Sequence, residues 1–193
     1  MKILNRLMAS AVAIFAVCSP AWAEGLYVEG AIGHTFGNEQ KYNSIDFDVD
    51  DAVSYGGAVG WNDLLGPFDV ELDIYRTERG YDGFSTDLIS LSVMANLIYD
   101  LPVHLGPVGF YAGAGLGTIN VEYDGGASFP AFSDDEWVFG WQALAGARTD
   151  FGDSGWSAFG EWRYQDAEDA TLAGLEVEYS SHTLLGGVRY TFR

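Results

Sequence analysis

The chain has 193 residues, enough for about one domain, and its 28 Asp and Glu against 9 Lys and Arg give a formal net charge of −19. A polyanion repels a phosphate backbone, which excludes nucleic-acid binding, and 6 Trp, 11 Tyr and 12 Phe are too many rings for a disordered chain. A single cysteine excludes disulfide scaffolds, zinc ribbons and Cys/His nucleophile pairs.

The first residues have the parts of an export signal, namely a positive start, a short apolar run and a small-x-small cleavage site, at Lys2 and Arg6, 7–17 and 21–23. We expect a cleaved signal peptide at 1–23 and one mature domain at 24–193. The apolar run is well short of the roughly 18 residues that a membrane-spanning helix needs. A lipoprotein would use Cys18, but Val17 stands where a small residue is wanted. Cleavage removes two positive charges and leaves −21 on the mature chain.

After residue 24 the hydropathy pattern has period two, which predicts β-strands. Starting at Phe68, apolar residues alternate with Asp69, Glu71 and Asp73, so a strand places these carboxylates on one face. The same pattern predicts eight strands, at 26–36, 51–61, 67–77, 87–99, 108–121, 137–150, 156–165 and 179–192.

The connections alternate in length along the chain. Short turns are predicted at 62–66, 100–106 and 151–155, and longer polar links at 37–50, 78–86, 122–136 and 166–178. An even number of strands of about ten residues, with alternating short and long connections, is typical of outer-membrane barrels. The predicted fold is therefore all-β, an eight-stranded antiparallel transmembrane β-barrel with an up-and-down meander.

The positions of the aromatic residues support a membrane barrel. The rings on the apolar faces beside the short turns and the terminus predict one interfacial belt, made of Trp61, Phe68, Tyr99, Phe110, Trp156, Tyr190 and Phe192. A thinner belt nearer the long links is predicted from Phe36, Tyr55, Phe139 and Trp162. The alternative is a soluble barrel with its apolar face inside. However, Gly113, Gly115 and Gly117 share a face with Tyr111, which suits a tight interior.

Three segments carry a family resemblance, the closing strand at 180–192, Gly-Phe-Tyr-Ala-Gly-Ala-Gly-Leu-Gly at 109–117 and Glu-Trp-Arg-Tyr at 161–164. Together they resemble the OmpA-like and opacity-protein-like family of small outer-membrane barrels. The resemblance implies an outer-membrane location among lipid and lipopolysaccharide. It also implies that the barrel assembly machinery reads Tyr190 and Phe192, although Arg193 follows them here.

The face opposite the apolar one predicts a polar barrel interior, made of Glu29, Asp69, Glu71, Asp73, Gln142, Arg148, Glu161, Arg163 and Arg189. In a narrow lumen such charges must be paired, so we expect the three arginines to bridge to acids and form a structural plug. The alternative is a low-conductance, cation-preferring pore, because the interior acids outnumber the arginines.

A lipid A-modifying enzyme is a further alternative, because Glu178, Ser180 and His182 share one face near the end of the last strand. Their order and spacing do not reproduce the motif of such enzymes, so we expect no catalytic residues. We also expect no cofactor and no metal. Asp46-x-Asp48-x-Asp50 lacks the glycine and the closing glutamate of a calcium loop, and His34 and His104 stand alone in the sequence.

The long links are acidic, for example at 134–136 and 166–169. Divalent cations can bridge such acids to anionic lipopolysaccharide, because two surfaces of like charge need a cation between them. The expected role is structural or interactive, with the links at 37–50, 78–86, 122–136 and 166–178 contacting an external ligand or host surface.

Overall fold

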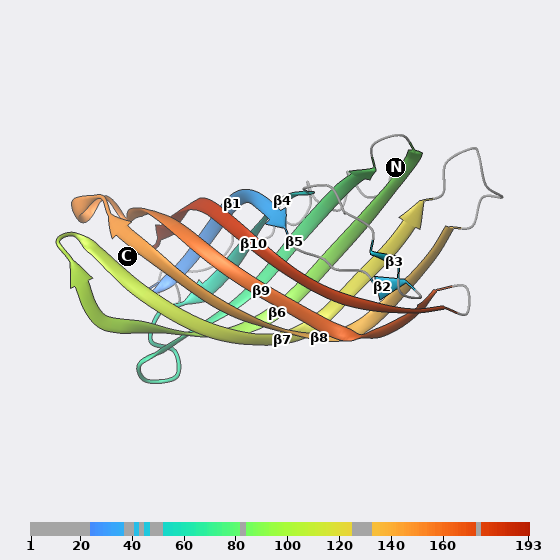
Figure 1. Cartoon of the computed structure of the whole chain (residues 1–193). Helices are drawn as coiled ribbons and strands as arrows, with labels where there is room; N and C mark the ends of the chain where they lie inside the picture. The colour runs from blue at the N-terminus through green and yellow to red at the C-terminus, as the bar shows by residue number, and fades with distance from the viewer. Residues whose placement is uncertain are drawn as a thin grey trace.

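The computed structural model describes residues 24–36, 41–42, 45–46, 52–81, 84–124, 133–172 and 175–193. Eight strands make up the barrel (Figure 1): β1 (Leu26–Phe36), β4 (Ala52–Trp61), β5 (Phe68–Tyr81), β6 (Phe84–Leu105), β7 (Val108–Asp124), β8 (Ser133–Asp150), β9 (Trp156–Leu172) and β10 (Leu175–Thr191). A separate two-stranded sheet consists of β2 (Lys41–Tyr42) and β3 (Ile45–Asp46), and a short 3-10 helix covers Gly152–Ser154. The predicted signal peptide at 1–23 lies outside the described residues.

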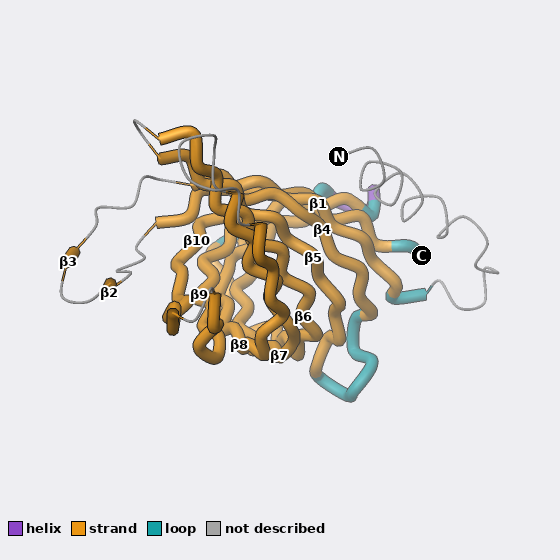
Figure 2. The backbone as a smooth tube through the Cα atoms, turned by 90° about the vertical axis from the view of Figure 1, so that its right-hand side faces the viewer, coloured by secondary structure: helices purple, strands orange, loops and turns teal. Residues whose placement is uncertain are grey.

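The barrel closes between its first and last strands. Each strand pairs antiparallel with its neighbour along the chain, and β1 pairs with β10 from Tyr27 opposite Thr191 to Phe36 opposite His182. Closure leaves no open sheet edge around the circumference, which a strand protein needs in lipid. Figure 2, turned a quarter-turn from Figure 1, shows the strands wound around one axis. The predicted eight-stranded antiparallel barrel is confirmed.

The two ends of the barrel differ. One end, called the turn end below, holds residue 24, the C-terminus and the connections at 62–67, 106–107 and 151–155. The opposite end is called the loop end.

No helix among the described residues is both long and apolar enough to cross a membrane.

The predicted long links are too long, because the strands continue toward the loop end. Within the predicted second, third and fourth links, residues 78–81, 84–86, 122–124, 133–136, 166–172 and 175–178 are strand. Beyond the bilayer both faces of a strand can meet water, so the apolar–polar alternation that identified the strands fades there. Most of the first link, 37–50, lies outside the described residues.

The predicted turn at 100–106 is also wrong in extent. Strand β6 continues to Leu105, and its pairing with β7 shifts register between Leu101 and His104. The tight turn is formed by Gly106, which has a φ of 62°, and Pro107. A bulge absorbs the extra residues around Pro102, which has no amide hydrogen to give to the ladder.

Burial is inverted relative to a soluble protein. Polar side chains such as Asp73, Asn96 and Gln142 are buried inside the barrel, whereas Ile32, Leu116 and Leu184 on the outer face are each more than half exposed. This arrangement suits a lipid solvent outside and a polar interior.

The interior also has a loop-end layer with two different halves. Met94, Ile119, Val138 and Tyr179 form an apolar cluster. Opposite strands carry a chain of hydroxyl hydrogen bonds, with oxygen–oxygen distances of 2.9, 2.6 and 2.6 Å, that joins Thr183, Thr35, Ser54 and Thr77. Small hydroxyl side chains let β10, β1, β4 and β5 curve closely while their polar groups stay satisfied.

Candidate functional site

Arg163 of β9 lies at the centre of the barrel interior. Its guanidinium Nη1 is 3.0 Å from Asp73 Oδ2 of β5, and its Nη2 donates to Glu161 Oε1 at 2.8 Å. The guanidinium also stacks over the ring of Tyr75, 4.3 Å from the ring centroid. All three charged side chains are at most 5% exposed, so one cation compensates two buried anions.

Neutral amides extend this charge cluster across the lumen. Gln142 of β8 donates to Asp73 Oδ2 at 2.8 Å and to Asn96 Oδ1 at 2.6 Å. Asn96 of β6 donates to Asp73 at 2.7 Å and to Glu71 at 3.1 Å. Gln165 of β9 donates to Gln142 at 3.0 Å. Side chains of four strands therefore meet in one continuous hydrogen-bonded layer, which we call the central network.

Arg189 of β10 forms a second cationic centre nearer the turn end. Its Nε donates to Glu29 of β1, and its Nη1 and Nη2 are 3.7 and 3.9 Å from carboxylate oxygens of Asp69 and Glu71. The guanidinium also lies over the ring of Tyr27, 3.8 Å from its centroid. Tyr27 donates to Glu71 at 3.0 Å, which connects this centre to the central network.

Arg148 does not join the central network. It pairs with Asp100 at 2.6 Å, and the Asp100 side chain is 55% exposed. Both residues line a vestibule of about 270 Å³ at the turn end, together with Asp69 and Arg189. The sequence placed Arg148 on the inward face but could not show that its position lies at the mouth, where β8 meets water.

Several interior residues were absent from the predicted set. Tyr111 donates to Glu161 at 3.1 Å, and Tyr27, Asn96, Gln165 and Asp100 make the contacts given above. The signal for Tyr27 was its parity with Glu29, two residues along the same strand. A tyrosine next to a strand end resembles an interfacial ring. Only its alternation along the strand, and not its residue type, identifies Tyr27 as facing the barrel interior.

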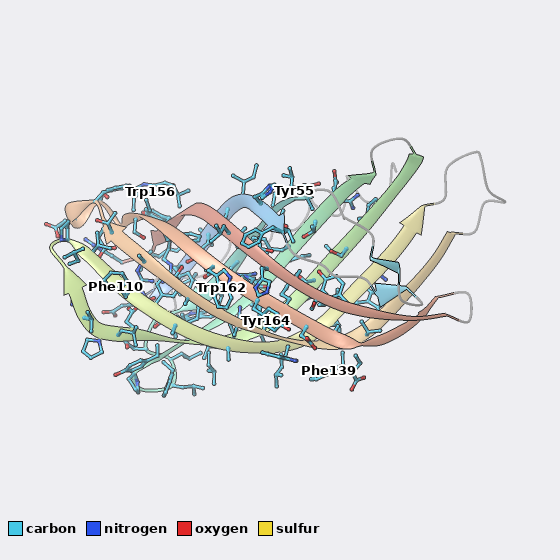
Figure 3. The ribbon with its side chains drawn as sticks, in the orientation of Figure 1. Tyr55, Phe110, Phe139, Trp156, Trp162 and Tyr164 are labelled. Atoms are coloured by element: carbon cyan, nitrogen blue, oxygen red, sulfur yellow. The ribbon has the colours of Figure 1, made fainter. Side chains whose placement is uncertain are left out.

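At the turn end the structure groups the rings that were assigned to the first belt. The ring centroids of Phe68 and Tyr99 are 5.5 Å apart, and those of Trp156 and Tyr190 are 5.0 Å apart. Phe192 packs edge-on against Tyr190 at 5.0 Å. Trp61 lies on the outer face of β4 and is partly exposed. Figure 3 shows Phe110 and Trp156 toward the turn end.

A second group of rings lies nearer the loop end. Phe36, Phe139 and Trp162 are exposed on the outer surface there, and Tyr55 is half-buried. Trp137 and Trp141 of β8 were not predicted as members, although they are 52% and 43% exposed on the same face as Phe139. Figure 3 shows Phe139, Trp162 and Tyr164 farther from the turns than Trp156.

His182 of β10 is enclosed by this second group. Its ring stacks on Phe36 and Trp162, with centroid distances of 6.2 and 5.8 Å, and is tilted against Tyr164 at 4.9 Å. Ser180 is half-buried on the same strand, and the side chain of Glu178 lies outside the described part of the chain. The His182 ring thus packs against three aromatic rings, which suits an interfacial position.

In the part of the chain that the structure describes, no group of three or more His, Cys, Asp or Glu side chains is arranged to hold a metal ion. The buried carboxylates instead face arginine, amide and tyrosine donors. The chemistry available inside the barrel is charge pairing and hydrogen bonding.

Comparison with known proteins identifies the family of this chain. A model of the outer membrane protein beta-barrel domain matches residues 9–192. Two proteins of Brucella abortus, from strain 2308 and from biovar 1 strain 9-941, are each 27% identical, over 90% of this chain and 87% of theirs.

Two solved structures share the fold. Neisserial surface protein A is 20% identical with a TM-score of 0.68, over 88% of this chain and 98% of that one. Ail of Yersinia pestis, solved with the heparin analogue sucrose octasulfate, is 16% identical with a TM-score of 0.50, over 86% and 99%. The chain therefore belongs to the outer membrane protein beta-barrel family and is a protein of the bacterial outer membrane.

Proposed function

We propose that this protein is a non-conducting, non-catalytic barrel that supports the outer membrane and presents its loop end to partners outside the cell. The central network is the observation that supports a closed lumen. Asp73, Asn96, Gln142 and Arg163 are each at most 3% exposed, although they come from four different strands. Side chains that meet and bond across a narrow barrel leave no continuous water path for ions.

The orientation follows from the family. In outer-membrane barrels the short turns face the periplasm and the longer connections face outward. The turn-end belt with Trp156 then lies at the periplasmic interface, and the rings around His182 lie toward the outer one. In this proposal lipid and lipopolysaccharide contact the outer face, and the barrel assembly machinery reads Tyr190 and Phe192.

Planar-bilayer recordings test the closed lumen. The refolded mature protein is expected to give no discrete current steps, provided that a heat-modifiability gel shows a folded barrel. Asn96→Ala together with Gln142→Ala removes two neutral members of the network and should open small, cation-selective steps, because the acids remain. Leu184→Ala, on the outer face, is the control and should stay silent. Regular steps from the unmodified folded protein would instead support the pore.

The role at the loop end is a contact role in this proposal. Ail binds sucrose octasulfate in its crystal structure. The present chain carries 28 acidic residues against 9 basic ones, so a sulfated glycan meets repulsion. Isothermal titration of the refolded protein with sucrose octasulfate is expected to show no binding under conditions in which Ail binds. Binding of similar strength by both proteins would contradict the charge argument.

A further inference from the structure

The barrel wall splits between β8 and β9 at the loop end. Their ladder ends at Gly140 opposite Ala167, although β8 begins at Ser133 and β9 continues to Leu172. Both strands stay paired on their other sides, β8 with β7 up to Ser133 and β9 with β10 up to Leu172. We call the open stretch between 133–139 of β8 and 168–172 of β9 the seam. Figure 1 shows the β7–β8 and β9–β10 hairpins separating there.

The seam opens at the outer surface of the membrane. Ala167 lies eleven positions after Trp156, which belongs to the turn-end belt. A tilted strand needs about ten residues to cross the roughly 25 Å apolar band of an outer-membrane barrel. The seam therefore begins at the outer membrane interface, where Phe139 lies, and extends from there into water.

Each edge carries unpaired backbone groups. In an antiparallel ladder every second residue directs both its N–H and its C=O toward the same neighbour. Within the described chain no strand pairs with 133–139 or 168–172 on the seam side. Trp137 and Phe139 stand beside this edge with about half of their surface exposed. Such an edge is a template for strand addition.

The charge of the seam selects the partner. In sequence the β8 edge contains Asp-Asp-Glu at 134–136, and the β9 edge contains Glu168 and Asp169. The two edges together carry five acids and no basic residue, which favours a basic partner. The chain's own link at 37–51 is a poor occupant because it has five acids and one lysine. A second copy, with a mature charge of −21, is disfavoured for the same reason.

We propose that the seam is a docking site for an extended, basic polypeptide segment of an external protein, which adds as a β-strand between β8 and β9. This inference rests on the contact role proposed above and names its partner class. Main-chain hydrogen bonds to both edges supply affinity, and lysine or arginine side chains opposite the acids supply selectivity.

Three labelled nine-residue peptides test the site on the refolded mature protein. The first alternates Lys and Val, the second has the same sequence with every amide nitrogen methylated, and the third alternates Glu and Val. The first is expected to bind at least tenfold more tightly than either of the others and to slow hydrogen exchange in 133–139 and 168–172. Equal binding of the methylated peptide, or protection only elsewhere, overturns strand addition.

Cross-linking provides a matched test on the protein. Trp137→Cys with Ala170→Cys continues the β8–β9 register three pairs beyond Gly140 and Ala167 and draws the two edges together in the middle of the seam. Ala114→Cys with Ala143→Cys joins a pair that is already opposed on β7 and β8, outside the seam. The first cross-link should reduce binding of the Lys-Val peptide at least tenfold, reversibly with reductant, and the second should not. Unchanged binding across a closed seam overturns the proposal, whereas the bilayer recordings test the closed lumen separately.

Discussion

Replacing Arg163 with methionine is expected to destabilise the barrel by about 3–5 kcal/mol, because it leaves two buried carboxylates without their cation. Asp73 and Glu161 both contact this guanidinium and are at most 5% exposed at their side chains. Urea titration of the protein refolded in lipid vesicles, followed by heat-modifiability on a gel, measures the change in the free energy of unfolding.

Two variants show whether the loss comes from buried charge. Adding Asp73→Asn and Glu161→Gln to Arg163→Met removes the unpaired charges and should recover most of the stability. Arg76→Met breaks a pair with Glu78 that is partly exposed, and should cost no more than about 1 kcal/mol. If Arg163→Met were as mild as Arg76→Met, the interior pair would not stabilise the barrel in the way its burial indicates.

The inward and outward faces were predictable from sequence because the pleat has a fixed period of two. Asp69, Glu71 and Asp73 fall on alternate positions of β5, and all three are buried inside the barrel. The period-two segments were sufficient for the number and order of the barrel strands, although the lengths of the connections were wrong. Parity and turn chemistry are local properties, so they can be read without a structure.

Partner choice across the lumen was not predictable in the same way. Arg163 meets Asp73 because β9 and β5 face each other at one height, which depends on the register of every ladder between them. Arg148 has the same inward parity but lies at the mouth with Asp100. The seam is likewise a property of unequal ladders, and the sequence predicted most of its residues as long links instead of strand.

Alanine at Gly60 or Gly146 is expected to cost about 1–3 kcal/mol of stability, because an added methyl group meets a tyrosine ring that cannot withdraw. A Cβ added at Gly60 would overlap Tyr27 Cζ, and one added at Gly146 would overlap Tyr111 Cζ. Each ring is held by its own hydroxyl, which donates to Glu71 in one case and to Glu161 in the other. The same urea titration measures both variants.

Gly186→Ala is the matched control, because a Cβ there has nothing within 4 Å, and its stability should be unchanged or slightly raised. The hydrogen bond to Glu71 is what holds the Tyr27 ring over Gly60, so Tyr27→Phe should free the ring to shift. Gly60→Ala is then expected to cost less in the Tyr27→Phe background than alone, a non-additivity that a double-mutant cycle reports. Strict additivity would mean that the ring is held by packing alone, and the hydroxyl would have no part in shaping the barrel wall.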